Sequence, residues 1–218
     1  MLVVVGGHSR NIGKTSVAAA LIAALPEAEW TAVKITQFGH GICTAAGKRC
    51  DCGTAPEHPY SITEETRPSR ADTGRFVAAG AKRCYWVRTA QGHLAAALAA
   101  LQEILASSRN SIVESNSLLE FVRPDLYLFV ADLGKTDFKP SARRYLERAD
   151  ALVIVAPERS GPVWNEVEDA LRASKRRFRV HPPSYTSEEL TEFVRSGLSR
   201  SGSRFAPQDD FRTEREIF

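Results

Sequence analysis

The chain has 218 residues, of which 43% are hydrophobic and 25% are charged, and its formal net charge is +3. This length and composition suit one α/β domain of residues 1–200 with a substantial core, and they exclude a disordered chain. The weak, scattered positive charge does not favour a nucleic-acid partner. No apolar run approaches the roughly 20 residues that a membrane span needs, and no secretion signal precedes the first strand. We therefore expect a cytoplasmic protein.

Apolar runs alternate with helix-like segments along the whole chain, which is typical of repeated β-α-β units. The expected strands are, in chain order, residues 2–5, 31–35, 83–87, 111–114, 126–131, 151–156 and 177–181. The expected helices are residues 14–25, 74–79, 92–107, 142–148, 163–174 and 187–199. Near-continuous apolar strands such as Leu126–Ala131 are typical of parallel sheets that are buried on both faces.

The first strand leads into a loop with the features of a polyphosphate-binding site. Gly6-Gly7 ends the strand, and Gly13-Lys14-Thr15 opens an alanine-rich helix. Backbone N–H groups in such a loop, and the positive end of the helix dipole, bind phosphate. In this pattern Lys14 reaches the β- and γ-phosphates of ATP or GTP, and the Thr15 hydroxyl binds Mg²⁺. The nucleotide-binding residues expected here are Gly7, Asn11, Ile12, Gly13, Lys14, Thr15 and Ser16. The sequence thus predicts an α/β, three-layer P-loop NTPase fold with a mostly parallel sheet.

The spacing of the glycines departs from the common P-loop pattern, which has four residues between them. The position of the first glycine holds His8, and counting from Gly7 gives five intervening residues. The alternative interpretation is a glycine-rich turn in a domain that binds no nucleotide. The adjacent Lys14 and Thr15 favour nucleotide binding, because a simple turn has little need of both.

Catalysis of phosphoryl transfer also requires a carboxylate near Mg²⁺. Ligands of parallel sheets lie at the carboxyl ends of the strands, and two acids, Glu114 and Asp132, end expected strands. We favour Glu114, together with Thr15, for binding Mg²⁺. The alternative for either acid is to cap the helix that follows it.

Two further charged residues are candidates for the same site. Asp72 opens the Asp72-Thr73-Gly74-Arg75 helix, so it is either an N-cap or a group near the Mg²⁺ and the γ-phosphate. Lys34 closes an otherwise apolar strand, and we expect it to bind an anion of the nucleotide. With these additions, the expected catalytic residues are Lys14, Glu114 and Asp72.

Residues 37–71 contain few large aliphatic side chains and are expected to form an irregular insertion. His40, Cys43, Cys50 and Cys52 lie close together within it. Four such ligands can close a tetrahedral zinc site and so order the insertion. The alternatives are free thiols on a mobile loop and, less favoured, an iron–sulfur cluster. At the other end of the chain, the polar residues 201–218 are expected to be a flexible tail or an arm that packs on a partner.

The spacing from Gly7 to Thr15 resembles that in dethiobiotin synthetase and in the enzymes that amidate cobyrinic and cobyric acid. The order of the other motifs resembles MobB, the molybdopterin-guanine dinucleotide biosynthesis adaptor. That family has a lysine in its second strand, a histidine-bearing loop, an Asp-Ser/Thr-x-Arg helix followed by Ala-Gly-Ala, and a strand that ends in glutamate. The corresponding segments here are 33–36, 39–41, 72–75 with 79–81, and 113–114, so the resemblance covers residues 1–135.

The resemblance to MobB implies an Mg²⁺-dependent NTPase that assists cofactor biosynthesis, with an unidentified small molecule or protein as partner and a homodimer as one assembly. The resemblance to dethiobiotin synthetase implies instead an ATP-dependent ligase. A third interpretation is a non-enzymatic metal-binding module with a vestigial P-loop, because His8 and Ser115 replace glycines of these patterns. A guanine-specific Asn-Lys-x-Asp box is absent, and Lys135-Thr136-Asp137 is a poor substitute. We therefore favour ATP slightly over GTP.

Overall fold

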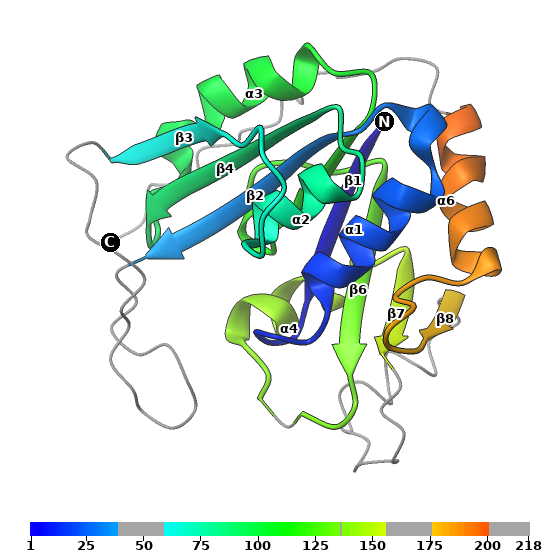
Figure 1. Cartoon of the computed structure of the whole chain (residues 1–218). Coiled ribbons are helices and arrows are strands. Elements are labelled where there is room, and N and C mark those ends of the chain that lie inside the picture. Colours follow the sequence, from blue (N-terminus) through cyan, green and yellow to red (C-terminus); the bar gives the residue numbers. More distant parts are fainter. Residues whose placement is uncertain (39–58, 136, 156–175, 201–218) are drawn as a thin grey trace.

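The computed structural model describes residues 1–38, 59–135, 137–155 and 176–200 (Figure 1). Eight strands of these residues form one sheet in the order β3-β4-β2-β5-β1-β6-β7-β8. Only β3 is antiparallel to its neighbour within this sheet. The strands are β1 (Leu2–Gly7), β2 (Thr31–Phe38), β3 (Tyr60–Glu64), β4 (Arg83–Ala90), β5 (Ser111–Glu114), β6 (Leu126–Asp132), β7 (Ala151–Val155) and β8 (Arg176–Val180).

Helices cover both faces of the sheet and make it the middle of three layers (Figure 1). One face carries α1 (Lys14–Ala24), α2 (Asp72–Ala78) and α6 (Glu188–Arg200). The other carries α3 (Leu98–Ala106) and α4 (Pro140–Leu146). Short 3₁₀ turns lie at η1 (Pro26–Ala28), η2 (Leu94–Ala97) and η3 (Ser117–Glu120).

The side chains of the central strand alternate between two apolar cores. Val3 and Val5 pack in the cluster that contains α1, whereas Leu2 and Val4 pack in the cluster that contains α3. Successive side chains of a strand point to opposite faces, so an apolar residue at every position requires a covering layer on each side. The expected α/β fold with a mostly parallel sheet is therefore confirmed.

The structure differs from the expectations at the edge of the sheet. The segment 37–71 is not irregular throughout, because residues 37–38 belong to β2 and residues 60–64 form β3. β3 pairs with β4 only, along one side, and its residues are all partly or fully exposed. Tyr60 and Ile62 alternate with Ser61 and Thr63, but they are only partly buried against the second core. An alternation this short, at the end of a polar segment, is a weak signal for a strand.

Other expectations fall outside the part of the chain that the structure describes. These are the helix at residues 163–174, the tail at residues 201–218, and the insertion between residues 39 and 58. The division into one domain of residues 1–200 stays a prediction. No helix of the described residues has both the length and the apolar character that crossing a membrane requires.

Helix α1 is tied to the sheet by Leu21, which is fully buried in the first core. Truncation of Leu21 to alanine should lower the free energy of unfolding by about 2–5 kcal/mol, because it removes buried methyl groups and leaves a cavity. Urea denaturation of the purified chain measures this loss. Ala23→Ser, at an exposed position of the same helix, is the control and should change the free energy by less than about 0.5 kcal/mol. Equal stability of the Leu21→Ala variant and the native chain would contradict this account of the core.

Candidate functional site

The loop of residues 7–15, which we call the P-loop, lies between the carboxyl end of β1 and the start of α1. A Cβ atom on Gly7 would lie 2.5 Å from the carbonyl oxygen of Val130 and 2.8 Å from Cδ1 of Ile12, so only glycine fits there. Gly13 precedes α1 with a φ of 93°, in the left-handed region that glycine adopts readily. Ile12 is buried and anchors the middle of the loop in the core.

The start of the P-loop is held by Asn116, which follows β5. The backbone N–H of Gly7 donates to Asn116 Oδ1 at 2.8 Å, and Asn116 Nδ2 donates to the Gly7 carbonyl at 2.8 Å. The amide side chain therefore replaces a backbone partner and satisfies both polar groups of Gly7. Sequence reasoning missed Asn116; its only signal is its place two residues after the strand-end Glu114.

His8 ties the P-loop to the segment after β6. It is fully buried, its Nδ1 lies 2.8 Å from the carbonyl oxygen of Asp137, and its Nε2 lies 3.0 Å from the backbone nitrogen of Asp132. The Asp132 N–H can only donate, so Nε2 accepts and the ring proton lies on Nδ1, which donates to Asp137. Burial is the main cause that lowers the pKa of His8, and the positive charge of Lys14 adds to it. His8 is therefore a neutral cross-link at the position where the common pattern has glycine.

Two more side chains join the P-loop to the same segment. The Lys135 ammonium donates to the carbonyl of Asn11, and the Ser9 hydroxyl donates to the Asp137 carboxylate. Lys135 and Asp137 are the residues that the sequence analysis considered as a poor substitute for a guanine-binding box. Both side chains contact the P-loop.

Lys14 begins α1 and its ammonium donates to the carbonyl of Ser9, across the P-loop. Burial lowers the pKa of Lys14 to about 8. Nearby Glu114 opposes this shift, whereas the positive charges of Lys34 and Lys139 add to it. An anion in the loop would favour the charged form of Lys14, because opposite charges at short range raise the pKa of an amine.

Four residues expected in the site come together beside Lys14. The Thr15 hydroxyl donates to Glu114 Oε2 at 2.7 Å. The Lys34 ammonium lies 2.6 Å from Glu114 Oε1 and 2.9 Å from Asp72 Oδ2. Glu114 is only 3% exposed, so both of its oxygens have partners inside the protein. We call Thr15, Lys34, Asp72 and Glu114 the carboxylate cluster.

The charges of the carboxylate cluster stabilise one another. Burial alone would lower the pKa of Lys34, but Glu114 and Asp72 outweigh it and hold the pKa above the ordinary value. Burial alone would raise the pKa of Asp72, but Lys34 outweighs it and keeps that pKa below the ordinary value. Lys34 and Asp72 are therefore both charged at neutral pH.

The remaining expected residues divide between the site and its surroundings. Ser16 accepts a hydrogen bond from the Arg75 guanidinium at 2.8 Å, which joins α2 to the first turn of α1. Of the two strand-end acids, Glu114 lies at Thr15, whereas the Asp132 carboxylate accepts a hydrogen bond from the N–H of Gly134 at 3.0 Å. Among the residues described, no group of histidine, cysteine and acidic side chains could hold a metal by itself. His40, Cys43, Cys50 and Cys52 lie outside those residues, so the zinc site is untested.

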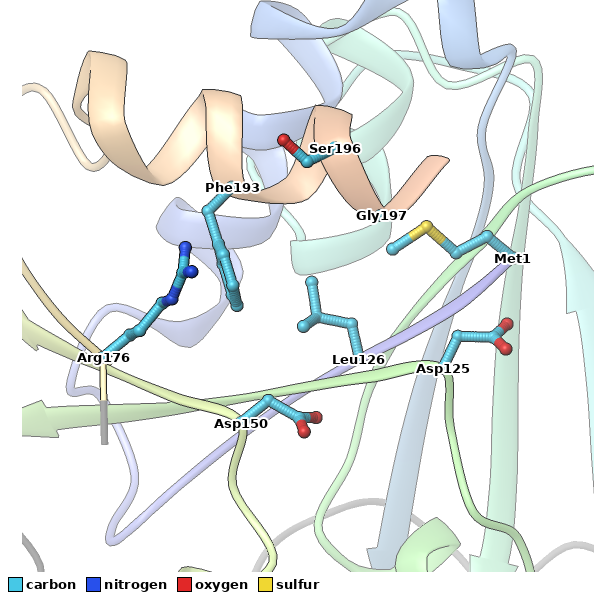
Figure 2. A pocket seen from close by; sticks show the side chains of 8 residues that line it. All are labelled: Met1, Asp125, Leu126, Asp150, Arg176, Phe193, Ser196 and Gly197. Carbon is cyan, nitrogen blue, oxygen red and sulfur yellow. The ribbon is translucent and has the colours of Figure 1, made fainter. Parts of the chain in front are cut away.

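A pocket of about 370 Å³ lies far from this site, where β6, β7 and β8 begin (Figure 2). Its two carboxylates already stabilise the fold. Asp125 accepts a hydrogen bond from the N–H of Leu2, and Asp150 accepts one from the N–H of Tyr127, each at 2.7 Å. Arg176 lies over the ring of Phe193 at 5.0 Å. Ligands of parallel α/β sheets bind at the opposite, carboxyl ends of the strands. The P-loop and the carboxylate cluster are therefore the better candidate site.

No protein-family model matches the sequence, and no curated protein matches it. Two solved structures are similar in fold. LpxK from Aquifex aeolicus, in complex with ATP, is 16% identical with a TM-score of 0.48, and the match covers 82% of this chain and 53% of LpxK. HypB from Helicobacter pylori, in complex with nickel, is 13% identical with a TM-score of 0.49, and the match covers 94% of this chain and 90% of HypB. The chain thus spans about half the length of LpxK, and identities this low assign no ligand to it.

The buried neutral His8 predicts a pH dependence of stability. Its pKa is lowered in the folded state, so the unfolded chain binds more protons as the pH falls through about 6.5. The stability that neutral His8 contributes is present above that pH and is lost progressively below it. Urea denaturation at a series of pH values between about 7 and 5 measures the slope.

The variant His8→Gln cannot titrate and should show a flatter slope than the native chain. His181→Gln, at an exposed histidine, is the matched control and should keep the native slope. A His8→Gln variant with the same slope as the native chain would show that His8 is not the buried neutral group inferred here.

Proposed function

We propose that this protein is an Mg²⁺-dependent NTPase that binds ATP or GTP in the P-loop. The observation that carries the proposal is the contact between Thr15, at the start of α1, and the buried carboxylate of Glu114. Phosphoryl-transfer enzymes hold Mg²⁺ next to the phosphates with a P-loop serine or threonine and a strand-end acid. Thr15 and Glu114 are such a pair. A vestigial turn has no reason to keep a carboxylate buried beside this threonine and a lysine.

In this proposal the residues of the P-loop bind the triphosphate. Backbone N–H groups from Asn11 to Ser16, at the amino end of α1, supply donors and the positive end of the helix dipole. The Lys14 ammonium exchanges its partner, the Ser9 carbonyl, for the β- and γ-phosphate oxygens. The cross-links through His8 and Asn116 hold the backbone in place before the nucleotide arrives, which reduces the ordering cost of binding.

The carboxylate cluster suits Mg²⁺ by its chemistry. Mg²⁺ prefers oxygen ligands and in proteins is held by one or two carboxylates together with substrate phosphates. Thr15 and Glu114 would hold it, with Asp72 near by, and the bound ion would neutralise charge on the phosphates. Lys34 forms ion pairs with Glu114 and Asp72, and in this proposal its ammonium also binds the γ-phosphate.

For the reaction, we propose hydrolysis or transfer of the γ-phosphoryl group. An oxygen of water or of an acceptor forms a bond to the γ-phosphorus, and the bond to the β-γ bridging oxygen breaks, so the nucleoside diphosphate leaves with that electron pair. Lys14 and Lys34 stabilise the negative charge of the transferring group. The proton of the nucleophile passes to solvent or to the phosphate product.

The finer role that we propose is assistance in cofactor biosynthesis, as in MobB. An ATP-dependent ligase of the dethiobiotin synthetase type is the second candidate, and the five residues between Gly7 and Gly13 favour it. In the ligase, a small carboxylic acid would accept the phosphoryl group. Stimulation of ATP turnover by a carboxylic acid distinguishes the two roles.

The role of Lys14 predicts how nucleotide binding depends on pH. Calorimetry with ATP or GTP and Mg²⁺ should detect binding at neutral pH, and Lys14→Ala should abolish it. Because the pKa of Lys14 is about 8, the affinity should fall as the pH rises above that value, by up to about tenfold per pH unit. Lys14→Arg stays charged and should lose this dependence.

Lys82→Ala is the control for the loss of one positive charge, because Lys82 lies on the surface in an ion pair with Glu29. It should leave nucleotide binding unchanged. Absence of ATP and GTP binding to the native chain would contradict the proposal and leave the metal-binding module with a vestigial P-loop as the better interpretation.

The role of Glu114 predicts the response to Mg²⁺. Glu114→Gln keeps the shape of the side chain and removes its charge, so the Mg²⁺ concentration that gives half-maximal phosphate release should rise by about 10–100-fold. Asp132→Asn, at the other strand-end acid, is the matched control and should respond as the native chain does. An unchanged Mg²⁺ requirement in Glu114→Gln, with the fold intact by circular dichroism, would remove Glu114 from the metal site.

A further inference from the structure

Arg75 is a cation of α2 that reaches the first turn of α1. The two helices lie side by side on one face of the sheet (Figure 1). Nη2 of Arg75 donates to Ser16 Oγ at 2.8 Å. Ser16 is the third residue of α1, directly after Lys14 and Thr15 of the proposed phosphate site. The guanidinium therefore lies beside that site, although Arg75 is not part of the carboxylate cluster.

The hydrogen bond to Ser16 uses only a small part of what this guanidinium can donate. A guanidinium carries five N–H donors. In the part of the chain that the structure describes, the Arg75 guanidinium makes this one hydrogen bond and no ion pair. Asp72 interacts with Arg75 through its charge, but its Oδ2 atom is paired with Lys34 at 2.9 Å. Arg75 is thus a partly buried cation, bonded to a neutral hydroxyl, with donors left for an anion.

Helix α2 is held in place by contacts that do not involve Arg75. Phe76 is 1% exposed and packs in the same core as α1. The Cys84 thiol donates to the carbonyl of Thr73 at 3.4 Å. A Cβ atom on Gly74 would overlap Ser69, so the segment before α2 packs closely on the helix. Fastening α2 to the protein therefore does not explain a charged side chain at position 75.

The backbone of Ser16 is itself a donor for phosphate. The first bond within α1 runs from the N–H of Val17 to the carbonyl of Gly13 at 2.8 Å. The N–H groups of Lys14, Thr15 and Ser16 therefore have no acceptor within the helix. In a P-loop, backbone N–H groups bind the α- and β-phosphates, and the lysine reaches the β- and γ-phosphates. Ser16 lies beyond the lysine and the Mg²⁺-binding threonine, which assigns its N–H to the α-phosphate.

We propose that Arg75 binds the α-phosphate of the nucleotide, together with the N–H of Ser16. The inference rests on the proposed function, because the nucleotide has to occupy the P-loop. Arg75 would donate charge-assisted hydrogen bonds to a non-bridging oxygen of the α-phosphate. The bond to Ser16 holds the guanidinium in place before the nucleotide arrives, which reduces the ordering cost of binding. Because the α-phosphate keeps all its bonds in the reaction, Arg75 holds substrate and product alike.

The first test compares nucleoside diphosphate with a non-hydrolysable triphosphate analogue, both with Mg²⁺, by calorimetry. The adenine or the guanine series is used, whichever the native chain binds more tightly. Arg75→Gln can still donate to Ser16 but carries no charge. It should weaken the binding of both nucleotides by a similar factor of about 10–100, because both contain the α-phosphate. Arg75→Lys should restore part of the affinity.

Arg195→Gln is the matched control for the loss of an arginine from a helix on the same face. Arg195 lies on the surface of α6, where it is paired with Glu192 and with Glu27 near the far end of α1. This variant should bind both nucleotides as the native chain does.

The second test locates the contact with diphosphate analogues in which sulfur replaces one of the two non-bridging α-phosphate oxygens. The two diastereomers differ in which oxygen is replaced, and sulfur is the weaker acceptor. Without Mg²⁺, which would itself select between them, the native chain should bind one diastereomer at least about threefold more weakly than the other. Arg75→Gln should bring this ratio closer to one, which a merely structural role of Arg75 would not do.

Three outcomes overturn the proposal. The first is equal affinity of the native chain and a folded Arg75→Gln variant for the diphosphate. The second is a loss confined to the triphosphate analogue, because it would place Arg75 at the γ-phosphate. The third is equal binding of the two diastereomers by the native chain, a measurement that decides even if Arg75→Gln does not fold.

The native chain separates the failure of this inference from the failure of the proposed function. If the native chain binds neither adenine nor guanine nucleotides, the NTPase and the role of Arg75 are both overturned. If the native chain binds nucleotide, Lys14→Ala abolishes binding and Arg75→Gln leaves it unchanged, the NTPase stands and only the role of Arg75 is overturned.

Discussion

The buried carboxylate of Glu114 is the group on which the arrangement of the site depends. A carboxylate that is 3% exposed requires charged and hydrogen-bonding partners, because an isolated buried charge costs far more free energy than folding can offset. Lys34 and Thr15 are those partners, and they come from β2 and the start of α1. Pairing this one charge therefore fixes the position of α1 relative to two strands. Asp72, on the other side of Lys34, brings in α2 as well.

The strand end of the P-loop, at Gly7 and His8, is held by hydrogen bonds to groups that carry no net charge. His8 connects the loop to the backbone after β6, and Asn116 connects it to the segment after β5. The common pattern has a glycine at position 8, where backbone segments pack closely. Here the buried His8 side chain and the Asn116 amide make the contacts instead. The loop thus has ionic contacts at its helical end and neutral contacts at its strand end, and its backbone is held from both ends.

Several features of the site could be predicted because their chemistry is local in the sequence. Gly13, Lys14 and Thr15 are adjacent, and Glu114 ends an apolar strand, so each is visible in a short window. That Lys34 meets Glu114 follows from the strand order, since β2 and β5 are neighbours in register although 80 positions separate these two residues. His8 was considered only as a departure from a pattern, and Asn116 was not considered, because their partners lie more than 100 residues away.

The sequence by itself determined the alternation of strands and helices, the parallel character of the sheet and the place of the glycine-rich loop between the first strand and the first helix. These properties depend on hydrophobic period and on residues that are adjacent in the chain. The tertiary structure alone decided which strand-end acid reaches Thr15, why a histidine fits where a glycine is usual, and which face of the sheet adjoins Lys34. Those outcomes depend on strand order and register, which bring distant residues within hydrogen-bond distance and which no local pattern encodes.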